Sequence, residues 1–236
     1  MRLFRSFIAD YVIYQSRFVS DWWNKEYGVP KVASTIIYNG VDLAQFNPRG
    51  SRYQSRADVC LLSVEGMQGV DPFDIAIQLA QGLEKKGLRV ELLLFGAPGK
   101  GAQSYFARHS FTSYRGPIPN SQLPHFYRGA TVYVSTDILN AGCPNSVIEA
   151  LACGTPVLGY NTGVLPEVLT ELAGRCVECE GDPWKGEPPG NREGMVRAAL
   201  ELLADRDFYH RGARRLAEER YSLEKMVDDY CRVLLG

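Results

Sequence analysis

A predicted short helix that leads directly into a predicted buried strand, near the middle of the chain, limits the fold more than any other feature. The helix begins at Asn145, carries apolar side chains at helical spacing and ends at Gly154. The apolar run 155–160 is then predicted as a buried strand, closed by the turn residues 161–163. Free backbone N–H groups and the positive end of the helix dipole would point into the loop before the helix, which suits an anion.

Glu149 lies one turn inside this helix, and the pattern leaves two interpretations open. In the first, Ser146 and Glu149 form a capping box, in which the carboxylate returns to the helix start and performs no chemistry. In the second, the carboxylate binds both hydroxyls of a ribose while the helix start holds a diphosphate. Short motifs carry a high false-positive risk, so the pattern alone does not decide between them.

The whole stretch NSVIEALACGTPVLGYNTGVLPEVL resembles the donor-site segment of the GT-B retaining glycosyltransferases of family 4, a group with many bacterial polysaccharide and lipopolysaccharide sugar transferases. The family pattern is Glu, seven residues, Glu, then Ala-x-Ala-x-Gly-x-Pro-Val. Glu149 matches the second Glu, residues 154–157 match Gly-x-Pro-Val, and residues 163–167 match a later Gly-x-x-x-Glu. Ala141 stands where the family has its first Glu, which contacts the transferred sugar.

The resemblance implies roles for individual residues. Glu149 would hold the ribose, and Ile118, just after the strand predicted at 111–114, would contact the nucleotide base. Gly163 and Glu167 would shape the pocket. The residues that would bind phosphate through backbone N–H groups are Asn145, Ser146 and Val147.

The loop after the strand predicted at 60–64 departs from the family pattern. Most members carry an Arg and then a Lys there, which together hold the donor diphosphate. This chain has Glu65 and Asp71 instead, and no basic residue occurs between Val64 and Lys85. A diphosphate carries roughly two or three negative charges, so the exchange is expected to weaken its binding.

Other groups are expected to compensate in part for the missing positive charge. Backbone N–H groups of the glycine loop at Gly66 and of the helix start suit a phosphate. The candidate substitute cations are Lys100, Arg108 and Arg115.

Strands that alternate with helices predict an α/β fold with a doubly wound parallel sheet and a ligand outside the carboxyl ends of the strands. The resemblance specifies the GT-B C-terminal Rossmann-like domain, and the segment ADYVIYQS at 9–16 resembles the end of the family's N-terminal domain. We therefore expect a remnant of that acceptor-side domain over 1–30, the nucleotide-sugar-binding domain over 31–220 and a crossover helix over 221–236.

Composition excludes several other classes of function. A formal net charge of -1 gives no basis for binding nucleic acid. Cys176 and Cys179 have metal-type spacing but no second Cys or His pair, and the glycine loop 96–101 lacks the G-x-G-x-x-G spacing of a dinucleotide site. We expect no metal and no cofactor.

No apolar run is long enough to span a bilayer, and the free thiols suit a reducing compartment, so a cytoplasmic protein that can contact the membrane surface is expected.

The resulting prediction is a glycosyltransferase donor half that transfers a sugar, with retention, from a nucleotide sugar to a glycan, lipid-linked or cell-envelope polysaccharide acceptor. The alternative is a non-catalytic nucleotide-binding or scaffolding half of a split glycosyltransferase complex, and a nucleotide-sugar epimerase is a third interpretation. The three histidines, at 109, 125 and 210, do not match the family's catalytic His, which lies in its N-terminal domain. Apolar surface around Phe4, Phe7, Trp22 and Trp23 predicts a homodimer or a separate N-terminal-half partner.

Overall fold

The computed structural model describes residues 8–65, 71–140 and 142–236. Gly66 and Ala141, and with them the expected glycine-loop contact to phosphate, lie outside the described residues, as do Phe4 and Phe7. Within the described ranges, no helix is long and apolar enough to cross a membrane.

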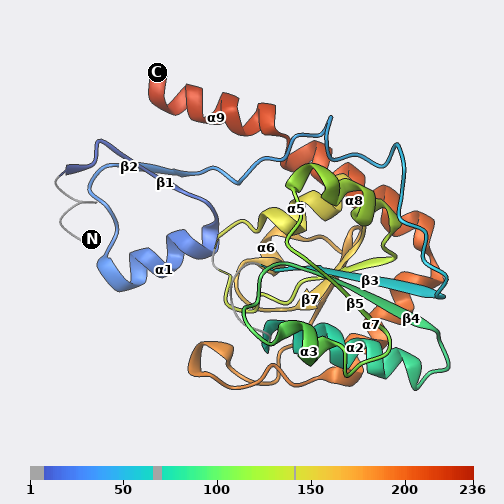
Figure 1. Ribbon diagram of the computed structural model, residues 1–236. Helices are drawn as coiled ribbons and strands as arrows, with labels where there is room; N and C mark the ends of the chain where they lie inside the picture. Colours follow the sequence, from blue (N-terminus) through green and yellow to red (C-terminus); the bar gives the residue numbers. More distant parts are fainter. Residues whose placement is uncertain (1–7, 66–70, 141) are drawn as a thin grey trace.

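Six parallel strands form the central sheet, in the order β5-β4-β3-β6-β7-β8 (Figure 1). Their bounds are β3 (Val59–Val64), β4 (Val90–Phe95), β5 (Thr112–Gly116), β6 (Val132–Val134), β7 (Val157–Tyr160) and β8 (Gly174–Val177). The order runs outward in both directions from β3 and β6, which is the doubly wound arrangement. The predicted fold class is confirmed.

Each face of the sheet is covered by helices and has its own apolar core. In β3, Cys60 and Leu62 face one core while Val59 and Leu61 face the other, as the two-residue period of a strand requires. The first core includes side chains of α4 (Leu123–Gly129), α5 (Asn145–Ala152) and α8 (Arg206–Arg220). The second includes side chains of α2 (Asp74–Glu84), α3 (Ala102–Phe106) and α7 (Arg192–Ala204).

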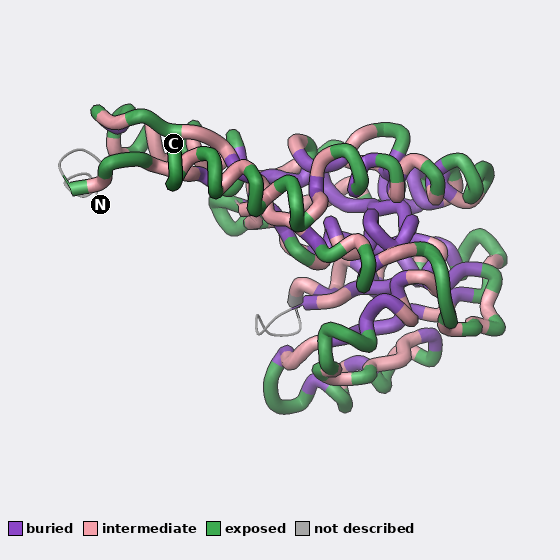
Figure 2. Tube along the Cα trace, turned by 90° about the horizontal axis from the view of Figure 1, so that it is seen from above, coloured by how far each residue is buried: buried purple, intermediate pink, exposed green. Residues whose placement is uncertain are grey.

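The N-terminal segment forms a separate unit of structure beside the main sheet. Strand β1 (Tyr11–Tyr14) pairs in parallel with β2 (Ala33–Ile36), and α1 (Arg17–Tyr27) connects the two. This pairing joins residues on both sides of the predicted boundary at 30. The last helix, α9 (Leu223–Leu235), extends to the same side of the molecule as this unit (Figures 1 and 2).

The structure differs from the expected element map mainly in its shortest elements. Helices α3 and α6 (Leu165–Val168) and the 3-10 turns η3 (Asn120–Gln122) and η4 (Pro183–Lys185) were not expected. Helix α2 is preceded by a further 3-10 turn, η2 (Asp71–Phe73). Such one-turn elements are too short to show a hydrophobic period, and tertiary packing fixes them.

Candidate functional site

The start of α5 presents free backbone donors at the carboxyl edge of the sheet. Pro144 is the N-cap residue, and the first intrahelical bond runs from the Ile148 N–H to the Pro144 carbonyl at 3.2 Å. The N–H groups of the three preceding residues therefore lack an intrahelical acceptor, as at any helix start. These residues are Asn145, Ser146 and Val147. With the helix dipole, they form a place where a negative charge is stabilised.

Two side chains fix the position of this helix start. The Asn39 side-chain amide donates to the Cys143 carbonyl at 2.8 Å and to the Asn145 side-chain oxygen at 3.0 Å. The Ser146 side chain lies beside the phenol of Tyr133, which donates to the Val64 carbonyl at 3.3 Å. Tyr133 is fully buried between the sheet and α5. The helix start is thereby tied to the ends of β3 and β6.

Glu149 points to the side of the helix rather than back to its start. Its Oε1 accepts from the Asn120 side-chain amide at 2.9 Å, and its Oε2 accepts from the Tyr127 hydroxyl at 3.0 Å. Because Pro144 rather than Ser146 is the N-cap residue and the helix start has no side-chain cap, the capping-box interpretation is wrong. Each carboxylate oxygen has accepted one hydrogen bond and keeps capacity for another.

A cavity of about 200 Å³ brings Glu149 and Asn145 together. The cavity is also lined by the segment after β2, from Gly40 to Phe46, and by Asn120. Burial raises the pKa of Glu149 above its ordinary value, while the bonds from Asn120 and Tyr127 oppose that shift. A partly desolvated carboxylate with two fixed oxygens is suited to bind a pair of neighbouring hydroxyl groups.

Glu65 lies directly after β3, in the loop where most family members carry a basic residue. Its carboxylate is buried and accepts a hydrogen bond from the Thr136 hydroxyl. Burial raises the pKa of Glu65 to about 7, and the nearby Asp137 carboxylate adds to the effect. At neutral pH the group is therefore protonated in part of the molecules, and its negative charge at this edge is reduced.

Gly163 allows the loops after β6 and β7 to meet. Its φ is 58°, and a Cβ at this position would lie 2.3 Å from the Asn140 carbonyl oxygen. The Val164 N–H donates to the same carbonyl at 2.9 Å, and the Thr162 hydroxyl donates to the Ile138 carbonyl at 3.2 Å. Gly163 thus shapes the edge of the sheet near the start of α5.

Glu167 has a different environment from Glu149. Its two carboxylate oxygens accept the backbone N–H groups of Arg17 and Phe18 at 2.7 Å and 2.9 Å, and Oε1 also accepts the Tyr38 hydroxyl at 2.6 Å. These contacts fasten the start of α1 to the main domain. The structure does not place Glu167 in the cavity of Glu149.

The remaining predicted residues follow the strands at the same edge or lie apart from it. Ile118 is half-buried and packs on the core beneath α4 and α5. Lys100 is exposed in the loop after β4. Arg115 lies over the ring of Tyr53 at 5.8 Å, and Arg108 lies over Tyr105 at 5.8 Å. Of the three candidate cations, Lys100 alone lies in a loop at the carboxyl edge.

Four neighbours of the site went unrecognised in the sequence: Asn39, Asn120, Tyr127 and Thr136. Asn39 precedes a glycine, so it was interpreted only as a turn residue. Tyr127 is a fully buried aromatic residue, so its hydroxyl needs a hydrogen-bond partner. The amino-acid sequence does not show which residue that partner is.

The described part of the chain holds no group of three His, Cys, Asp or Glu side chains arranged to bind a metal ion. Cys176 and Cys179 are free thiols, and His125 contacts the Ser51 hydroxyl at 3.3 Å. None of the three histidines lines the cavity of Glu149.

Comparison with known proteins identifies a matching family and individual relatives of this chain. The family model of glycosyl transferases group 1 matches residues 58–215. A D-inositol 3-phosphate glycosyltransferase of Saccharomonospora viridis is 27% identical over 243 residues, which cover 93% of this chain and 54% of that protein. An N-acetyl-alpha-D-glucosaminyl L-malate synthase of Bacillus anthracis is 30% identical over 87 residues, covering 36% of this chain and 20% of that protein. The chain thus spans about half the length of the first of these relatives.

Solved structures share the same fold. A glycosyltransferase from Rickettsia africae superposes with a TM-score of 0.78 at 14% identity, covering 98% of this chain and 65% of that chain. Anabaena HepE in complex with UDP-glucose superposes with a TM-score of 0.72 at 16% identity, covering 96% of this chain and 64% of that chain. The GT-B type of the predicted Rossmann-like fold is confirmed.

Proposed function

We propose that this chain, which belongs to the glycosyl transferases group 1 family, binds the nucleotide part of a nucleotide-sugar donor and takes part in transfer of its sugar. The family match supports the enzyme class over a purely scaffolding role. HepE, which shares the fold, was solved with UDP-glucose, and this supports a nucleotide sugar as the ligand.

The observation that carries the proposal is the fixed carboxylate of Glu149 beside the free helix start. Asn120 and Tyr127 hold its two oxygens, and Asn145 at the helix start lines the same cavity. A ribose placed there would donate its two hydroxyls to Glu149. The attached diphosphate would then accept from the N–H groups of Asn145, Ser146 and Val147.

Neutralisation of the diphosphate is proposed to need no metal and no other cofactor. The helix dipole supplies part of the positive potential, and Lys100, exposed in the loop after β4, is proposed to supply more. Partial protonation of Glu65 removes part of the opposing charge. Ile118 is proposed to contact the base, and Gly163 to keep the loop edge open; Glu167 is proposed to act through the position of α1.

The finer properties of the reaction follow from the family resemblance. We propose retention at the sugar carbon and an acceptor that is a glycan, a lipid-linked sugar or a cell-envelope polysaccharide. Because the chain spans 54% of the first curated relative, we propose that acceptor-side residues outside these 236 residues complete the active site. The buried free thiols of Cys60, Cys143 and Cys153 support a cytoplasmic location.

A partner is proposed to cover α1 and α9. Neither helix has a buried residue, and Trp22, Val227 and Leu235 are 43%, 46% and 82% exposed. Apolar surface of this kind favours association. We propose either a second copy of the chain or a separate acceptor-side polypeptide as this partner, and sedimentation of the pure chain distinguishes the two.

The test is thermal unfolding of the chain with UDP, GDP, ADP and their sugars. A ligand at one hundred times its dissociation constant stabilises by about 2.7 kcal/mol, which moves the midpoint by several degrees. We expect one nucleotide to produce this shift, Glu149→Ala to abolish it, and Glu84→Ala on the opposite face of the sheet to leave it unchanged. A folded wild-type protein that shifts with none of these compounds would contradict the proposal.

A further inference from the structure

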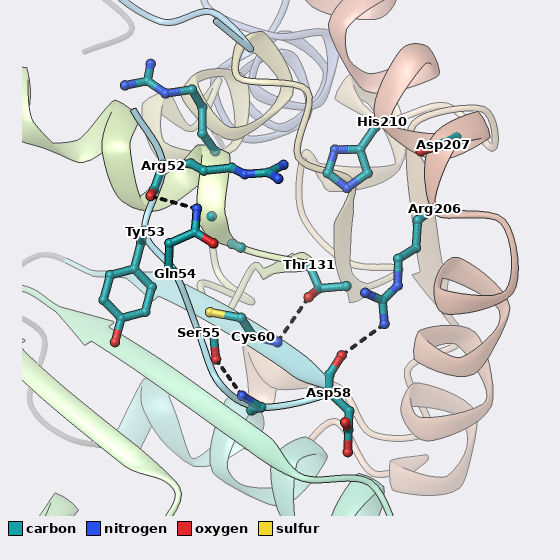
Figure 3. Close-up of a pocket in the computed structure, with 14 residues that line it drawn as sticks. Arg52, Tyr53, Gln54, Ser55, Asp58, Cys60, Thr131, Arg206, Asp207 and His210 are labelled. Carbon is teal, nitrogen blue, oxygen red and sulfur yellow. Dashed lines mark hydrogen bonds between the residues drawn. The ribbon is translucent and has the colours of Figure 1, made fainter. Parts of the chain in front are cut away.

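A second cavity, of about 400 Å³, lies at the edge of the sheet opposite to the start of α5 (Figure 3). Its walls come from the segment that leads into β3, from the residues just before β6 and from the first turn of α8. Asp58 and Thr131 line it, and each immediately precedes a strand, so the cavity is at the amino ends of the parallel strands. It is separate from the cavity of Glu149.

Two guanidinium groups and one imidazole reach this cavity from two different parts of the chain. Figure 3 shows Arg52 and His210 extending toward each other from opposite walls, with Arg206 below His210. The Arg206 guanidinium donates to the Asp58 carbonyl at 3.0 Å, which holds it in place. Within the described ranges, the Arg52 guanidinium makes no hydrogen bond or ion pair, so its five donors remain available.

The acidic residues of the lining only partly offset these cations. The Asp58 carboxylate is bound by Arg89, through the guanidinium at 2.7 Å and 3.2 Å and through the backbone N–H at 2.9 Å. Asp207 is the second acidic residue in the wall. Arg128 also lines the cavity, but its guanidinium donates to the carbonyls of Ser51 and Asn47. In the described part of the chain, none of Arg52, Arg206 and His210 forms an ion pair with these carboxylates.

We propose that this cavity binds the phosphoryl group of a small molecule, either free phosphate or a phosphate monoester, between Arg52, Arg206 and His210. A guanidinium offers paired donors that match phosphate oxygens, and charge-assisted bonds of this kind are about twice as strong as neutral ones. The Thr131 hydroxyl, which accepts from the Cys60 N–H at 3.0 Å, keeps its own proton for donation into the same space. The cavity has room for a phosphate and a small attached group.

The environment of His210 makes the proposed binding depend on pH. Burial lowers the pKa of His210; Arg206 and Arg52 lower it as well, and Asp207 opposes them. A bound phosphate would favour the protonated ring, so its affinity should rise as the pH falls through the range in which His210 titrates.

The first test is calorimetric titration of the full chain with inorganic phosphate at constant ionic strength. We expect saturable binding, a dissociation constant that increases at least about tenfold in Arg52→Gln, and tighter binding at pH 6 than at pH 8 in the wild type but not in His210→Gln. Arg56→Gln is the matched control, because Arg56 is also exposed and lies outside this cavity. Equal losses in Arg52→Gln and Arg56→Gln, or no saturable binding by the wild type, would overturn the proposal.

The second test separates this cavity from the proposed donor site. Glu149→Ala should leave phosphate binding unchanged, and Arg52→Gln should leave any nucleotide-induced stabilisation unchanged. Titration with glucose 6-phosphate identifies the source of the phosphoryl group, because tighter binding than free phosphate indicates a monoester and equal or weaker binding indicates free phosphate. Loss of phosphate binding in Glu149→Ala would place the anion at the helix start and overturn the proposal.

Discussion

The carboxylate of Glu167 lies 2.7 Å from the backbone nitrogen of Arg17, although 150 positions separate the two residues in the chain. The same carboxylate accepts the Phe18 N–H, while the Ser16 hydroxyl accepts the Val19 N–H at 3.0 Å. The first three N–H groups of α1 are therefore capped, two of them by a residue of the main domain. This contact joins the N-terminal unit to the sheet.

We predict that Glu167→Gln loosens α1. One oxygen that accepts a hydrogen bond is replaced by an amide that donates, and loss of a charged bond to a backbone N–H costs about 1.5–3 kcal/mol. Hydrogen exchange of the peptides that cover α1 should become faster by a factor of ten or more. Glu171→Gln, at an exposed position four residues on, is the control, and equal exchange rates in the two variants would show that Glu167 does not hold the helix.

Removal of the Tyr127 hydroxyl should weaken the site at Glu149. Tyr127→Phe keeps the buried ring but leaves Oε2 of Glu149 with one donor fewer, at a cost of about 1.5–3 kcal/mol in the free energy of unfolding. The stabilisation produced by the active nucleotide should fall as well. Tyr221→Phe, which removes an equally buried hydroxyl from the Val168 carbonyl, should reduce stability without changing the nucleotide effect. Similar nucleotide effects in both variants would contradict the assignment of Glu149.

The stability of the chain should depend on pH through Glu65. Its pKa of about 7 in the folded state lies above its ordinary value of 4.5, so the folded state binds the proton more tightly than the unfolded state. The corresponding stabilisation is complete below pH 4.5, decreases as the pH rises and is lost above pH 7. It amounts to roughly 3 kcal/mol.

Glu65→Gln isolates this contribution, because the amide oxygen can still accept from Thr136. Urea unfolding of both proteins at pH 5 and pH 8 should show that the variant gains stability relative to the wild type at the higher pH. The exposed Glu84→Gln should show no such change. A constant difference between Glu65→Gln and the wild type at both values would rule out titration of Glu65 in this range.

Substitution of Gly163 should lower the free energy of unfolding by more than the strain of its left-handed backbone conformation alone. Gly163→Ala adds a Cβ that would lie 2.3 Å from the Asn140 carbonyl oxygen, whereas Gly87→Ala has the same sign of φ and nothing within 4 Å. The left-handed conformation costs about 1–2 kcal/mol in both, and the overlap at Gly163 adds about 1–3 kcal/mol. Thermal unfolding of the two variants measures the difference, and equal losses would show that the loops move apart without cost.

Local sequence predicted the elements that carry their own start and stop signals. In helix α1, Ser16 caps the first turn and Gly28 ends the last one. Ser222 likewise caps α9 through the Lys225 N–H. The four inner strands, β3, β4, β6 and β7, are largely apolar runs that can be buried only between two layers of helices, and this dictated the doubly wound fold. The motif around Glu149 was sufficient to indicate the family.

Only the tertiary structure decided what the chemical groups of that motif contact. The local pattern left a capping box open for Glu149, but Asn120 and Tyr127 from another loop and helix bind its carboxylate. The family resemblance implied a role for Glu167 in shaping the pocket, and the fold shows that its carboxylate accepts the backbone N–H groups of Arg17 and Phe18. Hydrophobic periodicity acts over a few neighbouring residues and is written in the local sequence, whereas a carboxylate bonds to whichever donors the completed fold brings within about 3 Å.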